Sequence, residues 1–205
     1  IHGFILLAVF VSLNLLSISS AVILQSTIGI WIAIFSVIIL KEKLNPRIIF
    51  SLILSFIGLL FIIEPNMLII KESLIGIISA LFVGVFGGVV YVVSKTFTHY
   101  NKYSLTFWQN LIAVPFILPL LFFNPPIISV FSISVFILIG LLGGVSFLLL
   151  YVGMGKLDGQ KSSVLVLLYL VFTIIMGFLF FKEVPTSREV IGGLFIILGS
   201  YISAK

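Results

Sequence analysis

Two long stretches of this sequence, residues 3–40 and 103–155, contain no aspartate, glutamate, lysine or arginine. A helix needs about 20 residues to cross the roughly 30 Å hydrocarbon core of a bilayer, so each stretch is long enough to cross twice. Each also contains a break at a suitable place. "SISS" (17–20) interrupts the first, and "NPPIIS" (124–129) interrupts the second with two prolines that disfavour helix.

The composition agrees with a membrane protein, because 61% of the residues are hydrophobic and only 8% are charged. Soluble domains carry about 25% charged residues. The net charge of +5 comes from basic residues scattered between apolar runs, which argues against a nucleic-acid surface. The absence of cysteine excludes thiolate metal sites. We predict an all-α polytopic membrane protein with eight transmembrane helices, near 3–18, 21–40, 46–63, 74–94, 105–123, 130–152, 163–181 and 187–202.

The distribution of lysine and arginine predicts the orientation of these helices, because such residues favour cytoplasmic loops. With eight crossings, alternate loops place eight of these residues on one side and three on the other. We therefore expect a multi-pass protein of the plasma membrane with both ends cytoplasmic. Because the chain begins with isoleucine in an apolar segment, we also expect a segment to precede it.

A repeat appears when the sequence is shifted over itself by 141 residues. Lys41-Glu42 then falls on Lys182-Glu183, Arg47 on Arg188 and Gly58 on Gly199. Five predicted crossings separate the two copies, an odd number, so the copies face opposite sides of the membrane. This pattern predicts an inverted-topology repeat, in which a substrate site lies near the midplane between the halves.

The charged turns of the two copies have a structural interpretation. Asn45 before Pro46 predicts a helix cap, and Thr186 with Glu189 predicts a capping box. Glu42 and Glu183 are then expected beside the positive N-terminal end of the next helix. A gating salt bridge is the alternative interpretation.

Polar side chains in the middle of a span should face a neighbouring helix or a water-filled cavity, because unsatisfied polar groups are costly in hydrocarbon. The rival to a substrate site is hydrogen bonding between helices. Trp108, Gln109 and Asn110 are expected to be interfacial anchors. No carboxylate lies in mid-span to couple transport to an ion, which favours a neutral, zwitterionic or apolar substrate. The candidate substrate-binding residues are Asn14, Gln25, Gly29, Ser36, Ser79, Tyr91, Ser146, Tyr151, Tyr169 and Thr173.

Small residues recur every four positions in the fourth predicted helix, at Gly76, Ala80, Gly84 and Gly88, and the sixth repeats the pattern at Gly140 and Gly144. Such stripes allow helix backbones to approach closely. We therefore expect close packing at both.

Three segments resemble the EamA-type members of the drug/metabolite transporter superfamily: "SVIILKEKLNPRIIFSLILSFIGLLFI", "LYLVFTIIMGFLFFKEVPTSREVIGGLFIILGSY" and the link "YVGMGKLDGQKSS". The resemblance implies helices three to ten of a ten-helix inverted-repeat fold. Residues 1–64 would be the last three helices of a first repeat, and residues 65–205 a complete second repeat. Members often carry proline where this chain has Gly29 and Tyr169-Leu170.

By this resemblance the chain is expected to be a secondary transporter that moves a small metabolite, amino acid or amphiphile by alternating access. Efflux is one expected direction of transport. A lipid-linked sugar flippase of the same fold and a non-transport assembly subunit remain alternatives. We expect no enzyme, because no nucleophile, base or metal ligands converge in mid-span, and no cofactor. The expected partners are a small-molecule substrate and membrane lipid, without nucleic acid, and a homodimer is left open.

Overall fold

A computed structural model describes residues 1–43, 45–62, 73–97, 99–119, 129–182 and 184–204, and in these ranges the regular structure is helical throughout. The helices are α1 (His2–Leu15), α2 (Ile18–Ser26), α3 (Ile28–Ile39), α4 (Pro46–Ile62), α5 (Leu74–Thr96), α6 (Lys102–Ile117), α8 (Val130–Met154), α9 (Gly159–Leu165), α10 (Leu168–Phe181) and α11 (Ser187–Ala204). The prediction of an all-α protein is confirmed for these residues.

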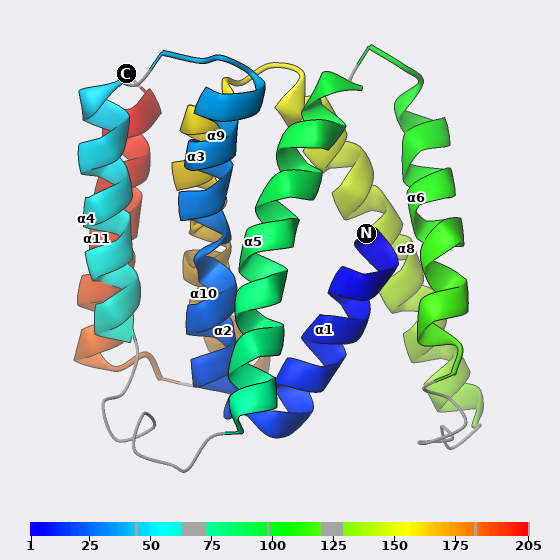
Figure 1. The fold of residues 1–205 in the computed structure, drawn as a ribbon. Coiled ribbons are helices and arrows are strands. Elements are labelled where there is room, and N and C mark those ends of the chain that lie inside the picture. The colour runs from blue at the N-terminus through cyan, green and yellow to red at the C-terminus, as the bar shows by residue number, and fades with distance from the viewer. Residues whose placement is uncertain (44, 63–72, 98, 120–128, 183, 205) are drawn as a thin grey trace.

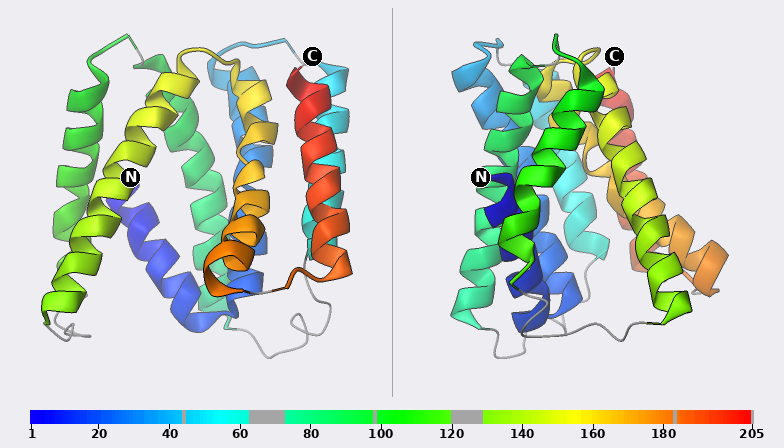
Figure 2. Two further views of the ribbon diagram at one scale, coloured as in Figure 1. Left: turned by 180° about the vertical axis from the view of Figure 1, so that it is seen from behind. Right: turned by 90° about the vertical axis from the view of Figure 1, so that its right-hand side faces the viewer.

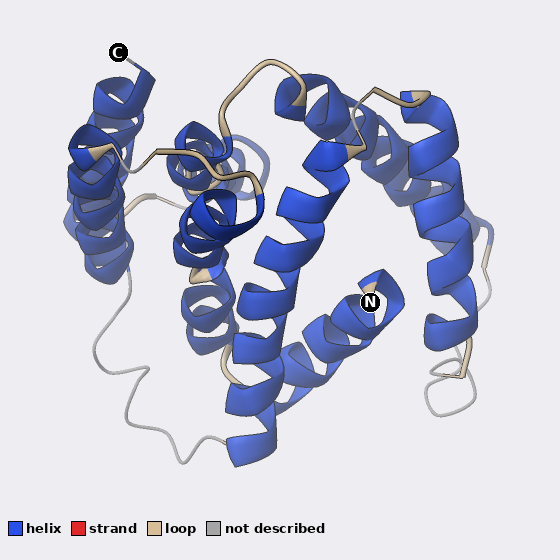
Figure 3. Cartoon of the chain, turned by 45° about the horizontal axis from the view of Figure 1, so that its top comes forward, coloured by secondary structure: helices blue, strands red, loops and turns tan. Residues whose placement is uncertain are grey.

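The helices stand side by side in one bundle, with α4 and α11 paired at one edge and α6 and α8 at the other (Figures 1 and 2). Between them, α2 and α3 form one column and α9 and α10 another, while α5 packs beside α1, α2 and α3 (Figure 1). We call the ends of the bundle upper and lower as Figure 1 shows them. The α3–α4 turn, the α5–α6 turn and the α8–α9 link lie at the upper end, and Figure 3 looks toward that end.

Local sequence signals place several helix ends where we predicted them. The Asn45 carboxamide oxygen accepts a hydrogen bond from the Arg47 backbone N–H at 3.0 Å, and α4 starts at Pro46. Thr186 and Glu189 form the predicted capping box, with the Glu189 N–H 3.3 Å from Thr186 Oγ1 and the Thr186 N–H 2.7 Å from the Glu189 carboxylate. The break predicted at residues 17–20 is present, because Ser17 caps α2. The break predicted at 124–129 falls mostly outside the described residues.

Two of the predicted helices are each divided in two, which the sequence did not indicate. The helix expected over 21–40 starts at Ile18 and is divided at Thr27, and the helix expected over 163–181 starts at Gly159 and is divided at Val166-Leu167. Both divisions contain backbone hydrogen bonds to the third residue back, such as Ile30 N–H to Thr27 O and Tyr169 N–H to Val166 O. Such bonds mark a tighter turn within a helix.

The count of eight membrane crossings stays a prediction. Within the described residues, four helical segments are long and apolar enough to span a bilayer: 20–39, 74–96, 130–154 and 159–180. The helices over 2–15 and 46–62 are apolar but shorter. The tighter turn at Thr27 and that at Val166-Leu167 therefore lie inside segments that are each long enough to cross.

The glycine stripe of α5 packs closely, as predicted. A Cβ atom on Gly76 would lie 2.8 Å from the Leu16 side chain, and one on Gly84 would lie 2.2 Å from the Thr27 hydroxyl oxygen. In α8 the expectation is wrong, since within the described ranges no atom of another helix lies within 4 Å of the Cβ positions of Gly140 and Gly144. The face of α8 that carries these glycines has no closely packed neighbour among the described residues.

The pair α4 and α11 is antiparallel and meets at glycines. A Cβ atom on Gly58 would lie 2.5 Å from the Gly192 carbonyl oxygen, and one on Gly192 would lie 2.4 Å from the Gly58 carbonyl oxygen. Two turns away, a Cβ atom on Gly199 would lie 2.7 Å from the Ser51 carbonyl oxygen. Backbones this close leave no room for a side chain, so these glycines set the distance between the two helices.

Candidate functional site

One hollow in the described part of the chain lies between α5, α6 and α8, beside the start of α1. It has a volume of about 510 Å³. A second hollow of about 170 Å³ continues it, and the two share His2, Val90, Ser94, Gln109 and Tyr151. We call these two spaces together the central hollow.

The walls of the central hollow are mainly apolar and aromatic, with a few polar side chains. None of the described residues that line it is an aspartate, glutamate, lysine or arginine. The buried Tyr151 hydroxyl donates a hydrogen bond to the Gln109 carboxamide oxygen, which ties α8 to α6. This lining suits a ligand with an apolar body and a few hydrogen-bonding groups. Among the described residues, no three His, Asp or Glu side chains come together to hold a metal ion.

A third hollow, the upper hollow, adjoins the central hollow. It has a volume of about 220 Å³ and shares Tyr91, Leu150 and Met154 with it. Leu157 of the α8–α9 link and Ser162 of α9 complete its wall. The α8–α9 link, at the upper end of the bundle (Figure 1), therefore contributes to the wall of this hollow.

Two of the ten predicted substrate-binding residues, Tyr91 and Tyr151, line the central hollow. Gly29 and Ser36 instead lie at the contact between α3 and α9, where a Cβ on Gly29 would be 2.8 Å from the Ser163 carbonyl oxygen. Gly159 approaches the Ser36 hydroxyl at the same contact.

The other predicted residues bond to neighbouring helices or to their own. Gln25 donates to the Ser12 hydroxyl at 2.9 Å, and the Tyr169 hydroxyl lies 2.7 Å from that of Ser26. Asn14, Ser146 and Thr173 are exposed and bond to backbone carbonyls of their own helices, and Ser79 is half-buried on α5. Whether any of the ten contacts a substrate stays a prediction.

Several residues that the structure places at the central hollow were not predicted as substrate-binding residues, among them His2, Ser94 and Gln109. Gln109 was expected to be an interfacial anchor beside Trp108, but its side chain bonds to Tyr151 and lines the hollow. Spacing along α6 gives the signal that was available, because Gln109 shares a helix face with Leu105 and Ile112, which also line the hollow.

The acidic residue of the first charged turn is also placed differently from the expectation. Glu42 does not cap the helix that follows it. Its carboxylate accepts the backbone N–H groups of Gly159 at 2.8 Å and Gln160 at 3.0 Å, at the start of α9. The expectation was wrong because it considered only the nearest helix in the sequence. Glu183, the corresponding residue of the second copy, lies outside the described residues.

Comparison with known proteins identifies the family. The profile of the EamA-like transporter family matches residues 1–64 and 74–204, which is most of the chain. The chain belongs to the EamA-like transporter family. An uncharacterized transporter of Archaeoglobus fulgidus is 25% identical over 202 residues, which cover 95% of this chain and 69% of that protein. One solved crystal structure superposes with a TM-score of 0.79 at 18% identity, over 99% of this chain and 76% of that one, and shows the same fold.

Membership of the EamA-like family gives the coarse function. The chain is an integral, multi-pass membrane transporter of the drug/metabolite transporter kind, as its resemblance to that superfamily implied. The family and the archaeal relative point to transport rather than catalysis. The central hollow is therefore the candidate transport site of this EamA-like chain.

Proposed function

We propose that the chain is a secondary transporter that moves a small, uncharged or zwitterionic amphiphile through the central hollow by alternating access. The observation that carries this proposal is the position of the hollow. Its walls come from α1, in the predicted first repeat, and from α5, α6 and α8, in the predicted second repeat. A movement of one repeat against the other would change access to the hollow, as the transport cycle requires.

The contacts of α4 with α11 support an inverted repeat. The 141-residue shift carries Gly58 onto Gly199 and Ser51 onto Gly192. It therefore exchanges the contact between Gly58 and Gly192 with the contact between Ser51 and Gly199. Two antiparallel helices whose contacts exchange in this way are related by a two-fold axis that lies between them. On this basis we propose residues 1–64 and 65–205 as the two repeats.

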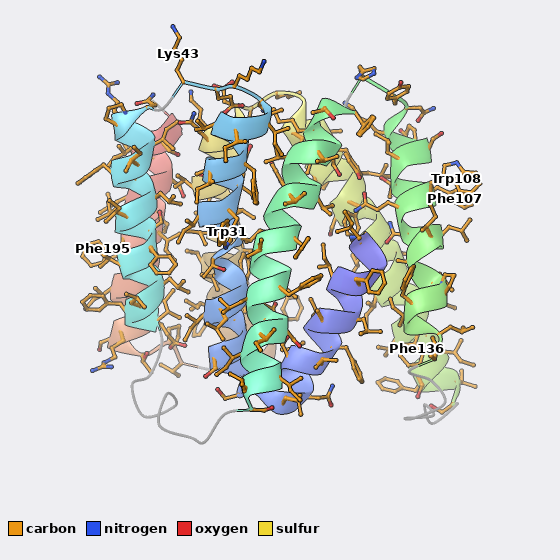
Figure 4. The ribbon with its side chains drawn as sticks, viewed as in Figure 1. Trp31, Lys43, Phe107, Trp108, Phe136 and Phe195 are labelled. Carbon is orange, nitrogen blue, oxygen red and sulfur yellow. The ribbon has the colours of Figure 1, made fainter. Side chains whose placement is uncertain are left out.

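The basic residues support the proposed orientation. In the described part of the chain, Lys182 and Arg188 lie at the lower end of the bundle (Figure 1). The upper end carries more basic residues, and Lys43 extends from its α3–α4 turn (Figure 4). The positive-inside rule then makes the upper end cytoplasmic. We propose the plasma membrane as the location. The described basic residues at the upper end are Lys41, Lys43, Arg47, Lys95, Lys102, Lys156 and Lys161.

A lipid-linked sugar flippase is the second candidate, and a groove between α6 and α8 favours it. The groove has a volume of about 460 Å³ and lies between α6 and α8. The α6 residues that line it, among them Thr106 and Asn110, lie on a face of α6 next to the one that carries Gln109. Phe147 of α8 lines both the groove and the central hollow. A substrate with a lipid tail would have a place for that tail beside the hollow, while Phe107 and Phe136 point outward from α6 and α8 (Figure 4).

Counterflow into liposomes tests the proposal. Purified protein is reconstituted, and labelled amino acids, nucleosides, amines and a lipid-linked sugar are screened. For the substrate that moves, Tyr151→Phe should lower the flux roughly tenfold, because loss of a buried hydrogen bond costs about 1–3 kcal/mol and each 1.4 kcal/mol is a factor of ten.

Ser134→Ala is the matched control, since Ser134 is exposed and bonds to the Val130 carbonyl of its own helix. Its flux should equal that of the unchanged protein. Movement of the lipid-linked sugar alone would favour the flippase. Equal flux in Tyr151→Phe and the unchanged protein would contradict the assignment of the central hollow.

A further inference from the structure

At the upper end of the bundle, the α3–α4 turn is bonded to the start of α9, 117 residues later in the chain. Besides the two N–H groups that the Glu42 carboxylate accepts, the Gln160 carboxamide bonds to the turn in both directions. It accepts the Asn45 backbone N–H at 3.2 Å and donates to the Lys43 carbonyl oxygen at 2.7 Å. Gln160 is only 3% exposed. Four hydrogen bonds therefore join the turn to α9.

Lys95, at the end of α5, joins the same cluster. Its ammonium nitrogen is 3.7 Å from a carboxylate oxygen of Glu42 and also donates to the Leu157 carbonyl oxygen of the α8–α9 link. The side chains of Lys95 and Glu42 are 16% and 19% exposed, so solvent screens their attraction only in part. The cluster thus connects three separate parts of the chain: the α3–α4 turn, the end of α5 and the start of α9.

The Glu42 contacts are of a strong kind. The first N–H groups of a helix have no partner within that helix, and the helix end carries partial positive charge. A carboxylate that accepts two such N–H groups makes charge-assisted hydrogen bonds, which are stronger than neutral ones. Removal of Glu42 would leave the Gly159 and Gln160 N–H groups without that partner.

The cluster adjoins the upper hollow, because Lys95 bonds to Leu157, which lines it. Leu157 and Ser162, which line that hollow, lie on either side of Gly159 and Gln160 in the sequence. Lys95 follows Tyr91 by one helical turn on α5, and Tyr91 lines both the upper and the central hollow. Lys95 thus bonds to a residue of the hollow's wall, and Glu42 bonds to the two residues that lie between the wall residues Leu157 and Ser162 in the sequence.

We propose that Glu42 is a positioning residue that keeps the upper hollow closed beside the α8–α9 link. Its bonds to α9 break whenever the upper hollow opens there. This inference rests on the proposed transport function, because it assigns one of the two closures that alternating access requires. Loss of Glu42 should shift the population toward a state open at the upper end, since the closed state alone contains these bonds.

Cysteine labelling can measure that opening, because the chain contains no cysteine of its own. Ser162→Cys places a thiol in the wall of the upper hollow at a position that is 3% exposed. A membrane-impermeant maleimide is added from the side that labels Lys43→Cys. In the Ser162→Cys background, Glu42→Ala should raise the labelling rate about tenfold or more, because hydrogen bonds to a charged group are lost. Glu42→Gln should give an intermediate rate, since its amide oxygen still accepts an N–H group.

Glu189→Ala in the same background is the matched control. Glu189 also accepts a backbone N–H at the start of a helix, but its partner is Thr186, three residues away at the lower end. Its loss should leave the labelling of Ser162→Cys unchanged. If Glu42→Ala does not fold, Glu42→Gln carries the test by itself. Labelling of the folded Glu42 variants at the rate of the unchanged protein would overturn the proposal.

The labelling experiment needs no substrate, so its outcome is separate from that of the counterflow screen. Faster labelling without flux of any compound would contradict the proposed transport function and leave the closure by Glu42 in place. Flux with unchanged labelling would contradict the role of Glu42 alone. The unfolding temperature distinguishes closure from general support of the fold. A variant destabilised elsewhere to the same unfolding temperature as Glu42→Ala should label Ser162→Cys more slowly than Glu42→Ala does.

Discussion

Gly192→Ala should destabilise the protein, although the same change at Gly143 should stabilise it. The added Cβ on Gly192 would lie 2.4 Å from the Gly58 carbonyl oxygen and 3.0 Å from the Ile62 backbone nitrogen. Backbone atoms of a packed helix cannot rotate away as a side chain can, so α4 and α11 would have to separate. Overpacking of this kind typically costs about 1–3 kcal/mol.

Gly143→Ala provides the control for the change in helix propensity. Among the residues that the structure describes, no atom of another helix lies within 4 Å of its Cβ position, and alanine is favoured over glycine inside a helix by about 1 kcal/mol. Thermal unfolding of both variants in detergent, followed by size-exclusion chromatography, should therefore give shifts of opposite sign. An unfolding temperature for Gly192→Ala equal to or above that of the unchanged protein would contradict the close contact of α4 with α11.

Ser94→Trp should abolish transport without unfolding the protein. Ser94 is half-buried on α5 and lines both parts of the central hollow, so an indole ring at this position would occupy the space that we assign to the substrate. Flux in the counterflow assay should fall to the level of empty liposomes. Ser94→Thr, which adds one methyl group, should retain most of it.

Leu194→Trp is the control for the addition of a large ring. Leu194 is 55% exposed on α11 and does not line either part of the central hollow. Its flux and its unfolding temperature should match those of the unchanged protein. Normal flux in a folded Ser94→Trp variant would show that the substrate passes elsewhere.

The features that sequence analysis predicted correctly depend on residues near one another in the chain. The Asn45 cap and the capping box of Thr186 and Glu189 each involve residues within three positions. The glycine stripe of α5 was predicted from helical spacing alone, and its partners were not needed to predict close packing. Hydrophobic runs and short capping motifs therefore contain enough information for the helices and most of their ends.

The features that were missed depend on contacts distant in sequence. Thr27 interrupts its helix where it packs on Gly84 of α5, and nothing local to Thr27 signals that neighbour. Glu42 bonds to Gly159 instead of the adjacent helix because the fold brings α9 to that turn. Gln109 was predicted to be an interfacial amide because its hydrogen-bond partner Tyr151 lies 42 residues away in the sequence. Three-dimensional neighbours decide such roles, and a single sequence does not contain them.

The central claim is that the two copies of the charged turn face opposite sides of the membrane around the hollow. Single cysteines at Lys43 and Val184 test it most directly, because both positions are exposed, Val184 by 82%, and the chain has no other cysteine. Each variant is labelled with an impermeant maleimide in intact cells and in inverted vesicles. We expect Lys43→Cys to react only in inverted vesicles and Val184→Cys only in intact cells. Reaction of both from the same side would contradict the account.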